Sequence, residues 1–288
     1  MNPLLKQIED GIKEEFKNPD IIWNSTYLSL DEKELLEQEC KKESEFDELH
    51  IRETFYERYK KGVYPCIVRE CEYGKVIVFL DSIEQDKDIP WALWGRILRI
   101  FQNDKIVKHK IFFFASRMLR KLPYRGEKIS PKHINGGYTY SCTTKGIFIY
   151  RAEDATRVLI HELFHASCTD DFNESIDTVE AKTEAWAELM YCGILSRGKR
   201  YIFKDLIQRQ SQYMLFQNKE ILHFIDEKKK EFPWRYTIGK EEVWRKWGIF
   251  DERIQKPDNY IKKSLRLTIH IPVSFKILMG VSAESTIL

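Results

Sequence analysis

The sequence predicts an α+β fold, with short strands in the middle of the chain and helices towards its two ends. Apolar runs of strand length, rich in β-branched and aromatic residues, lie between residues 64 and 150. The first 62 residues are instead charged and favour helices, and residues 155–248 also favour helices. The chain has 288 residues, of which 43% are hydrophobic. A chain of this length can bury a sizeable core.

The first part of the chain is expected to be a helix-rich extension that includes one β-hairpin. Ser29 and Glu32 have the spacing of a capping box, which indicates the start of a helix. Two β-rich runs flank Gly74, a pattern typical of a hairpin. The elements expected here are a helix over 29–61, a hairpin over 64–82 and a helix over 90–101.

The rest of the chain is expected to contain further strands and then mainly helices. The run that begins at Lys110 is apolar and aromatic, which indicates a buried strand. Asp154 has the side chain of an N-cap, and Gly198 marks the end of a later helix. The expected strands cover 110–115, 138–142, 146–150 and 265–271, and the expected helices cover 116–121, 155–167, 176–195, 200–230 and 233–248.

Charge and targeting signals exclude several classes of partner. The net charge of +2 gives no electrostatic argument for binding nucleic acid or an acidic membrane. The N-terminal residues lack the basic stretch and apolar core of a signal peptide, and no apolar run has the length of a membrane span. We therefore expect a cytoplasmic protein without nucleic-acid or membrane partners.

The cysteines are expected to be reduced thiols. They are scattered through a long chain that has no secretory signal, so the sequence does not indicate a disulfide framework. The six residues are Cys40, Cys66, Cys71, Cys142, Cys168 and Cys192.

The pattern His-Glu-x-x-His at residues 161–165 carries the main chemical prediction. Four residues rotate a helix by about 400°, so His161 and His165 lie one turn apart on nearly the same face and can bind one ion. Glu162 lies beside them, where it can reach a metal-bound water without binding the metal. Apolar neighbours such as Leu159 and Leu163 indicate a buried helix, whose polar groups need partners.

A second helix offers a third ligand. Glu180, Glu184 and Glu188 recur every four residues and therefore share one face of the predicted helix 176–195. Ala185 and Trp186 are among the apolar positions that indicate burial of this helix, and buried carboxylates require a cation. Two histidines and one carboxylate leave the fourth zinc position open for water, as in catalytic sites. We expect Zn²⁺ bound by His161, His165 and one of these glutamates.

These residues resemble the gluzincin group of zinc peptidases, which includes thermolysin-like enzymes and aminopeptidases. Eighteen residues separate His165 from Glu184, the spacing of many aminopeptidases in that group, so the resemblance implies Glu184 as the third zinc ligand. The resemblance covers roughly residues 110–195. It implies a zincin-like domain over 106–288, with a mixed sheet over the motif helix and a helical lower part, preceded by the extension over 1–105. The aminopeptidase motif Gly-x-Met-x-Asn is missing from this chain.

The same resemblance implies roles for further residues. Glu188 would support a histidine ligand through a hydrogen bond, and the strand 146–150 would be the edge strand that pairs with a peptide substrate. Glu162 would be the general base. Tyr236 is the favoured donor to the oxyanion, with Tyr213 and His223 as other candidates.

Two alternatives remain open at this point. The two histidines and the carboxylate also match the ligand set of non-haem iron hydroxylases, although Glu162 would then have no evident role. The metal, or no metal at all, could instead hold two helices together in a non-catalytic module. Structural zinc normally has four protein ligands, and a structural site does not need the base Glu162. The prediction is therefore a zinc-dependent peptidase that acts on peptides or proteins.

Overall fold

The structure is a computed structural model of the chain, and it describes residues 2–102, 108–225, 229–230, 232–253 and 264–269. The described residues divide into two compact units. The sheet unit consists of residues 20–119 and 135–169. The helical unit consists of the described residues of 2–19, 120–134 and 170–269.

The sheet unit is built on one mixed sheet of six strands, in the order β1-β2-β3-β4-β6-β5. β3, β4 and β6 run parallel to one another, whereas β2 and β5 are antiparallel to their neighbours. This topology confirms the α+β prediction and leaves β1 and β5 at the two edges. The strands are β1 (Asn24–Ser25), β2 (Cys66–Glu70), β3 (Gly74–Phe79), β4 (His109–Phe114), β5 (Gly137–Thr139) and β6 (Ile147–Ile149).

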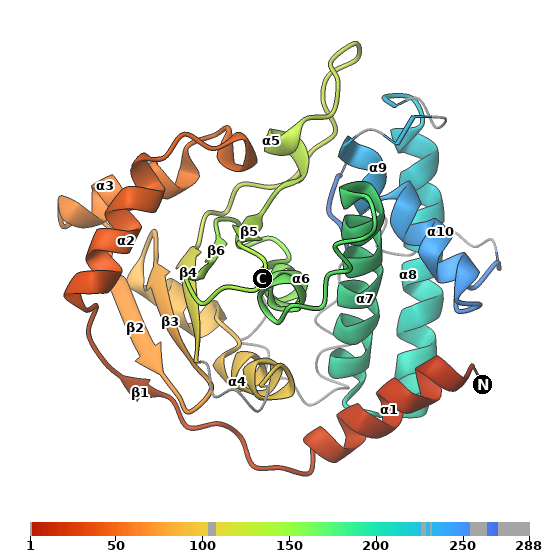
Figure 1. Cartoon of the computed structure of the whole chain (residues 1–288), viewed down its shortest axis with the longest axis horizontal. Helices are drawn as coiled ribbons and strands as arrows, with labels where there is room; N and C mark the ends of the chain where they lie inside the picture. The colour runs from red at the N-terminus through yellow and green to blue at the C-terminus, as the bar shows by residue number, and fades with distance from the viewer. Residues whose placement is uncertain (1, 103–107, 226–228, 231, 254–263, 270–288) are drawn as a thin grey trace. The chain divides into compact units, whose positions relative to one another are not determined.

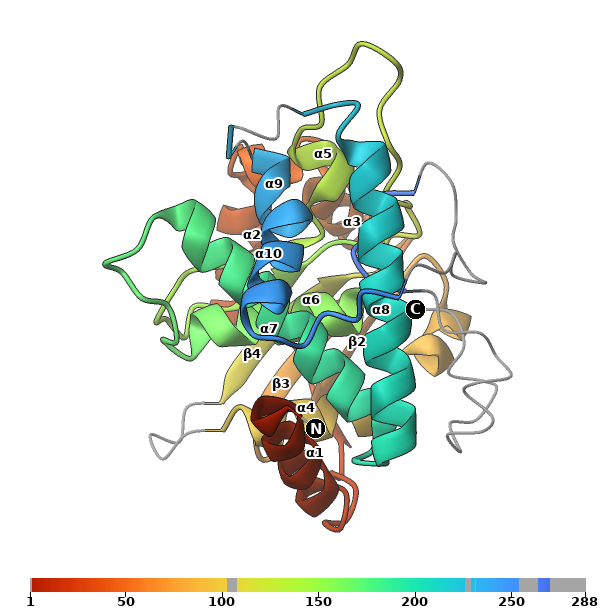
Figure 2. The same cartoon turned by 90° about the vertical axis from the view of Figure 1, so that its right-hand side faces the viewer.

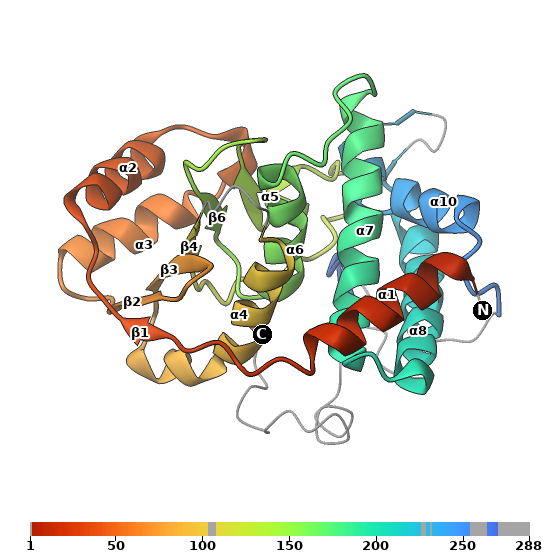
Figure 3. The same cartoon turned by 60° about the horizontal axis from the view of Figure 1, so that its bottom comes forward.

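Helices cover both faces of this sheet, as Figures 1 and 3 show. α2 and α3 pack on one face, where Phe55 and Phe112 belong to one apolar cluster. On the other face Trp94 of α4 packs against Phe113, with ring centroids 5.4 Å apart and ring planes inclined by 55°. The central strands are apolar at successive positions because both of their faces are buried. The helices are α2 (Leu30–Lys41), α3 (Ile51–Lys60), α4 (Trp91–Ile100) and α6 (Ala155–Ala166), with the 3-10 helices η1 (Glu45–Asp47) and η2 (Ile83–Asp88).

The helical unit is arranged around α7, which contacts α1, α8, α9 and α10. Figure 2 shows α7 and α8 running side by side. Gly193 of α7 allows α1 to pack closely against α7, since a Cβ at this position would come within 2.9 Å of Ile8 on α1. No helix in the described part of the chain has the length and apolar character that a membrane span requires. The helices are α1 (Pro3–Glu15), α5 (Pro131–Ile134), α7 (Ile176–Ser196), α8 (Arg200–Ile221), α9 (Phe232–Tyr236) and α10 (Ile238–Lys246).

Several predicted elements are confirmed. The capping box forms between Ser29 and Glu32, the predicted hairpin is β2–β3, and the predicted helix over 90–101 is α4. α7 ends where Arg197 and Gly198 adopt left-handed backbone conformations, as predicted for this boundary. Strands from both sides of residue 105, the predicted domain boundary, share the single sheet.

The single helix predicted over 29–61 is wrong, because α2 ends at Lys41 and α3 begins at Ile51. The Asp47 carboxylate accepts hydrogen bonds from the backbone N–H groups of Ile51 and Arg52, at 3.1 and 3.0 Å. These bonds satisfy donors that the first turn of a helix leaves free. Asp47 therefore marks the start of α3. The pattern of charged and apolar residues alone did not separate α3 from α2.

Three further predictions fail in the described residues. Residues 116–121 are not helical, and Lys121 instead forms an isolated bridge with Ser264. Asp154 precedes α6 as predicted, but its backbone is left-handed and its side chain makes no capping hydrogen bond. Residues 265–269 form no strand, and the end of that predicted strand, 270–271, lies outside the described residues.

Candidate metal centre

α6 carries the His-Glu-x-x-His pattern and packs against β5 and β6 of the sheet unit. Its apolar side chains Leu159, Ile160 and Leu163 are fully buried. His161 and His165 are also buried, on the same helix. The predicted helix therefore forms, and it holds two imidazoles where few water molecules reach them.

The two imidazoles converge within the sheet unit. The Nε2 atoms of His161 and His165 lie 3.0 Å apart, and the ring planes are inclined by 72°. Two nitrogens that bind one tetrahedral zinc ion at its usual bond length are separated by about 3.3 Å. The observed separation is close to this value, so the pair fits the geometry of two ligands of one ion.

Glu162 lies beside the edge strand β5. A Cβ built on Gly137 would come within 3.5 Å of the Glu162 Oε1 atom and within 2.7 Å of Val158. It would also come within 2.9 Å of the carbonyl oxygen of Phe148. The absence of a side chain at Gly137 thus allows the strand to pass directly over the glutamate that was predicted to be the base.

The edge strand is β5, and not the strand 146–150 that the resemblance implied. β6 lies between β4 and β5 and has a neighbour on each side. The Tyr150 N–H donates to the Gly136 carbonyl at 2.8 Å, which sets the alternation of the antiparallel ladder. By this alternation the backbone groups of Gly137 and Thr139 face the open edge. The prediction was wrong because strand order depends on contacts distant in the sequence.

A buried polar network holds β5 to the helices on the far side of the sheet. The Tyr138 hydroxyl donates to Glu39 Oε2 at 2.8 Å and accepts from the Arg52 guanidinium. Burial raises the pKa of the Tyr138 hydroxyl, so it remains a neutral donor. An open groove of about 1090 Å³ runs beside the strand, with Phe46, Thr139 and Tyr140 among its lining residues. The edge strand is therefore fixed in place and opens onto a groove.

The carboxylates predicted to complete the site belong to α7, in the helical unit. Glu184 and Glu188 are buried, and Glu180 is half-buried. Within the helical unit Glu188 accepts a hydrogen bond from Thr268 at 2.6 Å and lies 3.4 Å from the Lys240 Nζ atom. The supporting role of Glu188 towards a histidine ligand stays a prediction.

The three candidate oxyanion donors also lie in the helical unit. The Tyr213 hydroxyl donates to the Arg266 carbonyl at 2.7 Å, and His223 is exposed after the end of α8. Tyr236 is buried in an apolar cluster and packs on Phe232, with ring centroids 5.1 Å apart. The role predicted for Tyr236 remains a prediction.

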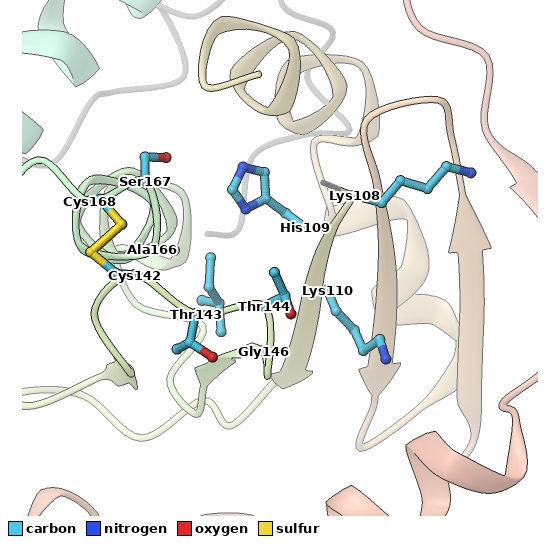
Figure 4. A pocket seen from close by; sticks show the side chains of 11 residues that line it. Lys108, His109, Lys110, Cys142, Thr143, Thr144, Gly146, Ala166, Ser167 and Cys168 are labelled. Atoms are coloured by element: carbon cyan, nitrogen blue, oxygen red, sulfur yellow. A yellow bond between two sulfur atoms is a disulfide. The ribbon is translucent and has the colours of Figure 1, made fainter. Parts of the chain in front are cut away.

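The expectation of reduced thiols is wrong for one pair of cysteines. Cys142 and Cys168 form a disulfide in the sheet unit, whereas Cys40, Cys66, Cys71 and Cys192 are not disulfide-bonded. Figure 4 shows the disulfide at the end of α6. The sequence contained no spacing signal for this pair, because the fold brings together two residues that are 26 positions apart.

We compared the chain with protein-family models, with curated proteins and with solved structures, and none of these comparisons found a match. The interpretation of the site therefore depends on its residues and their geometry.

Proposed function

We propose that this protein is a zinc-dependent peptidase, with His161 and His165 as two of its metal ligands. The observation that carries this proposal is the 3.0 Å separation of their Nε2 atoms on a buried helix. Imidazole nitrogen is a preferred ligand of zinc, and two histidines with one carboxylate form a common catalytic ligand set.

The third ligand in this proposal is a carboxylate of α7. Glu184 is the first choice, because it has the eighteen-residue spacing and its side chain is buried in an apolar helix. Glu180 lies one turn earlier on the same helix face and is the second choice. Either carboxylate would give the ion three protein ligands and leave one position for water.

Glu162 is the general base in the proposed mechanism. Zinc, when bound, makes a water molecule acidic near neutral pH and polarises a carbonyl group. Glu162 accepts the proton of the attacking water and passes it to the leaving amine of the cleaved peptide. Its carboxylate beside Gly137 places this proton transfer next to the edge strand.

The substrate in this proposal is an extended peptide that pairs with β5. An exposed strand edge binds such a peptide through its free backbone groups, here those of Gly137 and Thr139. The groove beside β5 accommodates side chains of the peptide. This arrangement positions the backbone of the substrate, and therefore its scissile bond, close to Glu162.

Metal content tests the ligand assignment. The purified chain is supplied with zinc, dialysed and measured by elemental mass spectrometry, in parallel with the variants Glu184→Ala, Glu180→Ala and Glu242→Ala. We expect about one zinc per chain in the wild type, and a loss of zinc in the variant that lacks the true ligand. Glu242 is exposed on α10, so its variant is the matched control and should retain zinc.

Cleavage of a peptide library tests the reaction. We expect Glu162→Gln to retain zinc and to reduce cleavage by about 10²–10⁴-fold. Equal cleavage by this variant would disprove the assigned base. Iron in place of zinc would favour the hydroxylase alternative, and a chain that takes up no metal would refute the metalloenzyme proposal.

A further inference from the structure

The Cys142–Cys168 disulfide encloses the whole candidate metal helix in one covalent loop. Cys142 follows β5, and Cys168 follows the last residues of α6. The segment between them contains β6 and α6, with both histidines of the candidate centre. Opening of this loop would therefore change the constraint on the helix that carries these ligands.

Solvent reaches the disulfide. Both cysteines are exposed, and both line a cavity of about 250 Å³. Figure 4 shows the sulfur–sulfur bond on one wall of this cavity, near Ser167 and Thr143. A low-molecular-weight thiol can therefore approach the two sulfur atoms while the sheet unit remains folded.

The backbone around the disulfide is held in an unfavourable conformation. Cys142 and Cys168 have φ angles of 57° and 59°, in the left-handed region that side chains other than glycine rarely adopt. The backbone N–H groups of both residues donate to the same acceptor, the His165 carbonyl oxygen, at 3.0 and 3.1 Å. The covalent bond thus maintains two strained residues against the last turn of α6.

We propose that Cys142–Cys168 is a thiol-exchange site for a low-molecular-weight thiol, and that its reduction loosens the C-terminal end of α6. The thiolate of the small molecule attacks the sulfur of one cysteine and forms a mixed disulfide with it. The bond between the two cysteines breaks, and the other sulfur leaves as a thiolate that takes a proton from water. A second small thiol then attacks the mixed disulfide. The products are two protein thiols and one oxidised small disulfide, so two electrons pass to the protein.

The reduced state has a physical reason to differ from the oxidised one. Without the covalent link, each cysteine can leave the left-handed region, and its N–H group then leaves the His165 carbonyl. Loss of both hydrogen bonds frees the backbone carbonyl of His165, a residue that the proposed function assigns to the metal. Control of metal binding by the thiol state is therefore a consequence that rests on the proposed function, whereas the exchange itself does not.

The first experiment measures exchange on the full-length chain. Protein purified in air is equilibrated with glutathione buffers of graded ratio, quenched with acid, alkylated and analysed by peptide mass spectrometry. We expect Cys142 and Cys168 to become alkylated together as the buffer becomes more reducing, with no denaturant present. In a second arm a dithiol buffer replaces glutathione. It shows whether a dithiol, the chemistry of protein reductants, reduces the disulfide as well as glutathione does.

The other cysteines are internal controls. Cys40, Cys71 and Cys192 are buried, and burial raises the pKa of the Cys40 thiol to about 12. They should remain unlabelled in the native protein at every ratio. The exchange proposal is overturned if Cys142 and Cys168 are already alkylated before any reductant is added, or if they are reduced only after denaturation.

The second experiment follows the end of α6 without reference to metal or activity. Amide hydrogen exchange is compared between the oxidised chain, the reduced chain and the double variant Cys142→Ser/Cys168→Ser. We expect the amides of residues 142 and 168 to exchange about tenfold faster or more after reduction. The double variant should behave like the reduced chain in any buffer, and Cys192→Ser should behave like the wild type.

Zinc binding separates this inference from the proposed function. If the reduced chain binds zinc more weakly than the oxidised chain, the thiol state regulates the metal centre. Unchanged exchange rates at residues 142 and 168 after complete reduction would overturn the loosening of α6. If neither state binds zinc while the two cysteines still exchange with glutathione, the proposed function fails and the thiol site stands.

Discussion

The two units of the molecule bury polar groups in different ways. In the helical unit the buried Glu188 carboxylate lies beside the buried Lys240 ammonium, and Lys240 also donates to the Leu267 carbonyl at 2.7 Å. This pair combines opposite charges. In the sheet unit the buried groups that face each other on α6 are two imidazoles of the same kind. The first arrangement balances charge within the fold, whereas the second brings together two nitrogens of a kind that zinc prefers.

Breaking the ion pair of the helical unit should have the largest effect on stability. Lys240 is fully buried, so Lys240→Met leaves the Glu188 charge in the interior without its ammonium partner. We expect a loss of about 4 kcal/mol in the free energy of unfolding, measured by urea denaturation. Lys246→Met, at an exposed position of the same helix, is the control and should change stability by less than about 0.5 kcal/mol. Equal stability of the two variants would contradict the structural role of the pair.

The histidine pair should respond to metal. With free zinc at about 100 times its dissociation constant, we expect the wild type to gain about 2.7 kcal/mol over the chelator-treated protein. His165→Gln should abolish this gain and should change the stability of the metal-free chain by less than about 1 kcal/mol. Thermal unfolding with zinc and with chelator measures both quantities. A gain of the same size in the variant would show that zinc binds elsewhere.

The close approach of β5 to α6 can be tested at one glycine. A methyl group at Gly137 would collide with Val158 and with the backbone carbonyl of Phe148, which cannot move without displacing the strand. We expect Gly137→Ala to cost about 2 kcal/mol and to lower any peptidase activity. Gly11→Ala on α1 is the control, since a Cβ there meets no atom within 4 Å. That substitution should stabilise the chain by about 0.5–1 kcal/mol.

Local features of the fold were predictable, and features that depend on distant contacts were not. The spacing of His161 and His165 is a property of five consecutive residues, and α6 forms where this pattern predicts it. The division of the helix over 29–61 depends on Asp47, whose carboxylate caps α3 only once the intervening turn is folded. A pattern of charges could not reveal that turn.

The same distinction applies within the candidate site. The sequence of β6 predicts a strand. Its position between β4 and β5 follows from antiparallel pairing with β5, where Gly137 lies opposite Ile149, and from parallel pairing with β4. The Cys142–Cys168 pair likewise depends on how β5 and α6 end near each other. Sequence therefore predicted the helix that carries the two imidazoles and Glu162, but it did not predict the strand edge or the disulfide beside them.

The smallest predicted effect concerns a second ion pair, at the margin of the sheet unit. Lys75 Nζ lies 2.7 Å from Glu32 Oε2. Burial raises the pKa of Glu32, but the hydrogen bonds from Lys75 and from the Ser29 N–H, together with the charge of Lys75, outweigh burial, so the folded-state pKa is lower than usual. This carboxylate therefore stabilises the fold above its unfolded pKa, and the contribution disappears as the pH falls through the folded pKa.

Glu32→Gln retains a capping acceptor and removes only the charge. Its cost in urea denaturation should be about 1 kcal/mol at pH 7, less than at the buried Lys240, and should vanish once the pH falls below the folded-state pKa. A cost that persists in acid would assign the effect to the cap rather than to the charge.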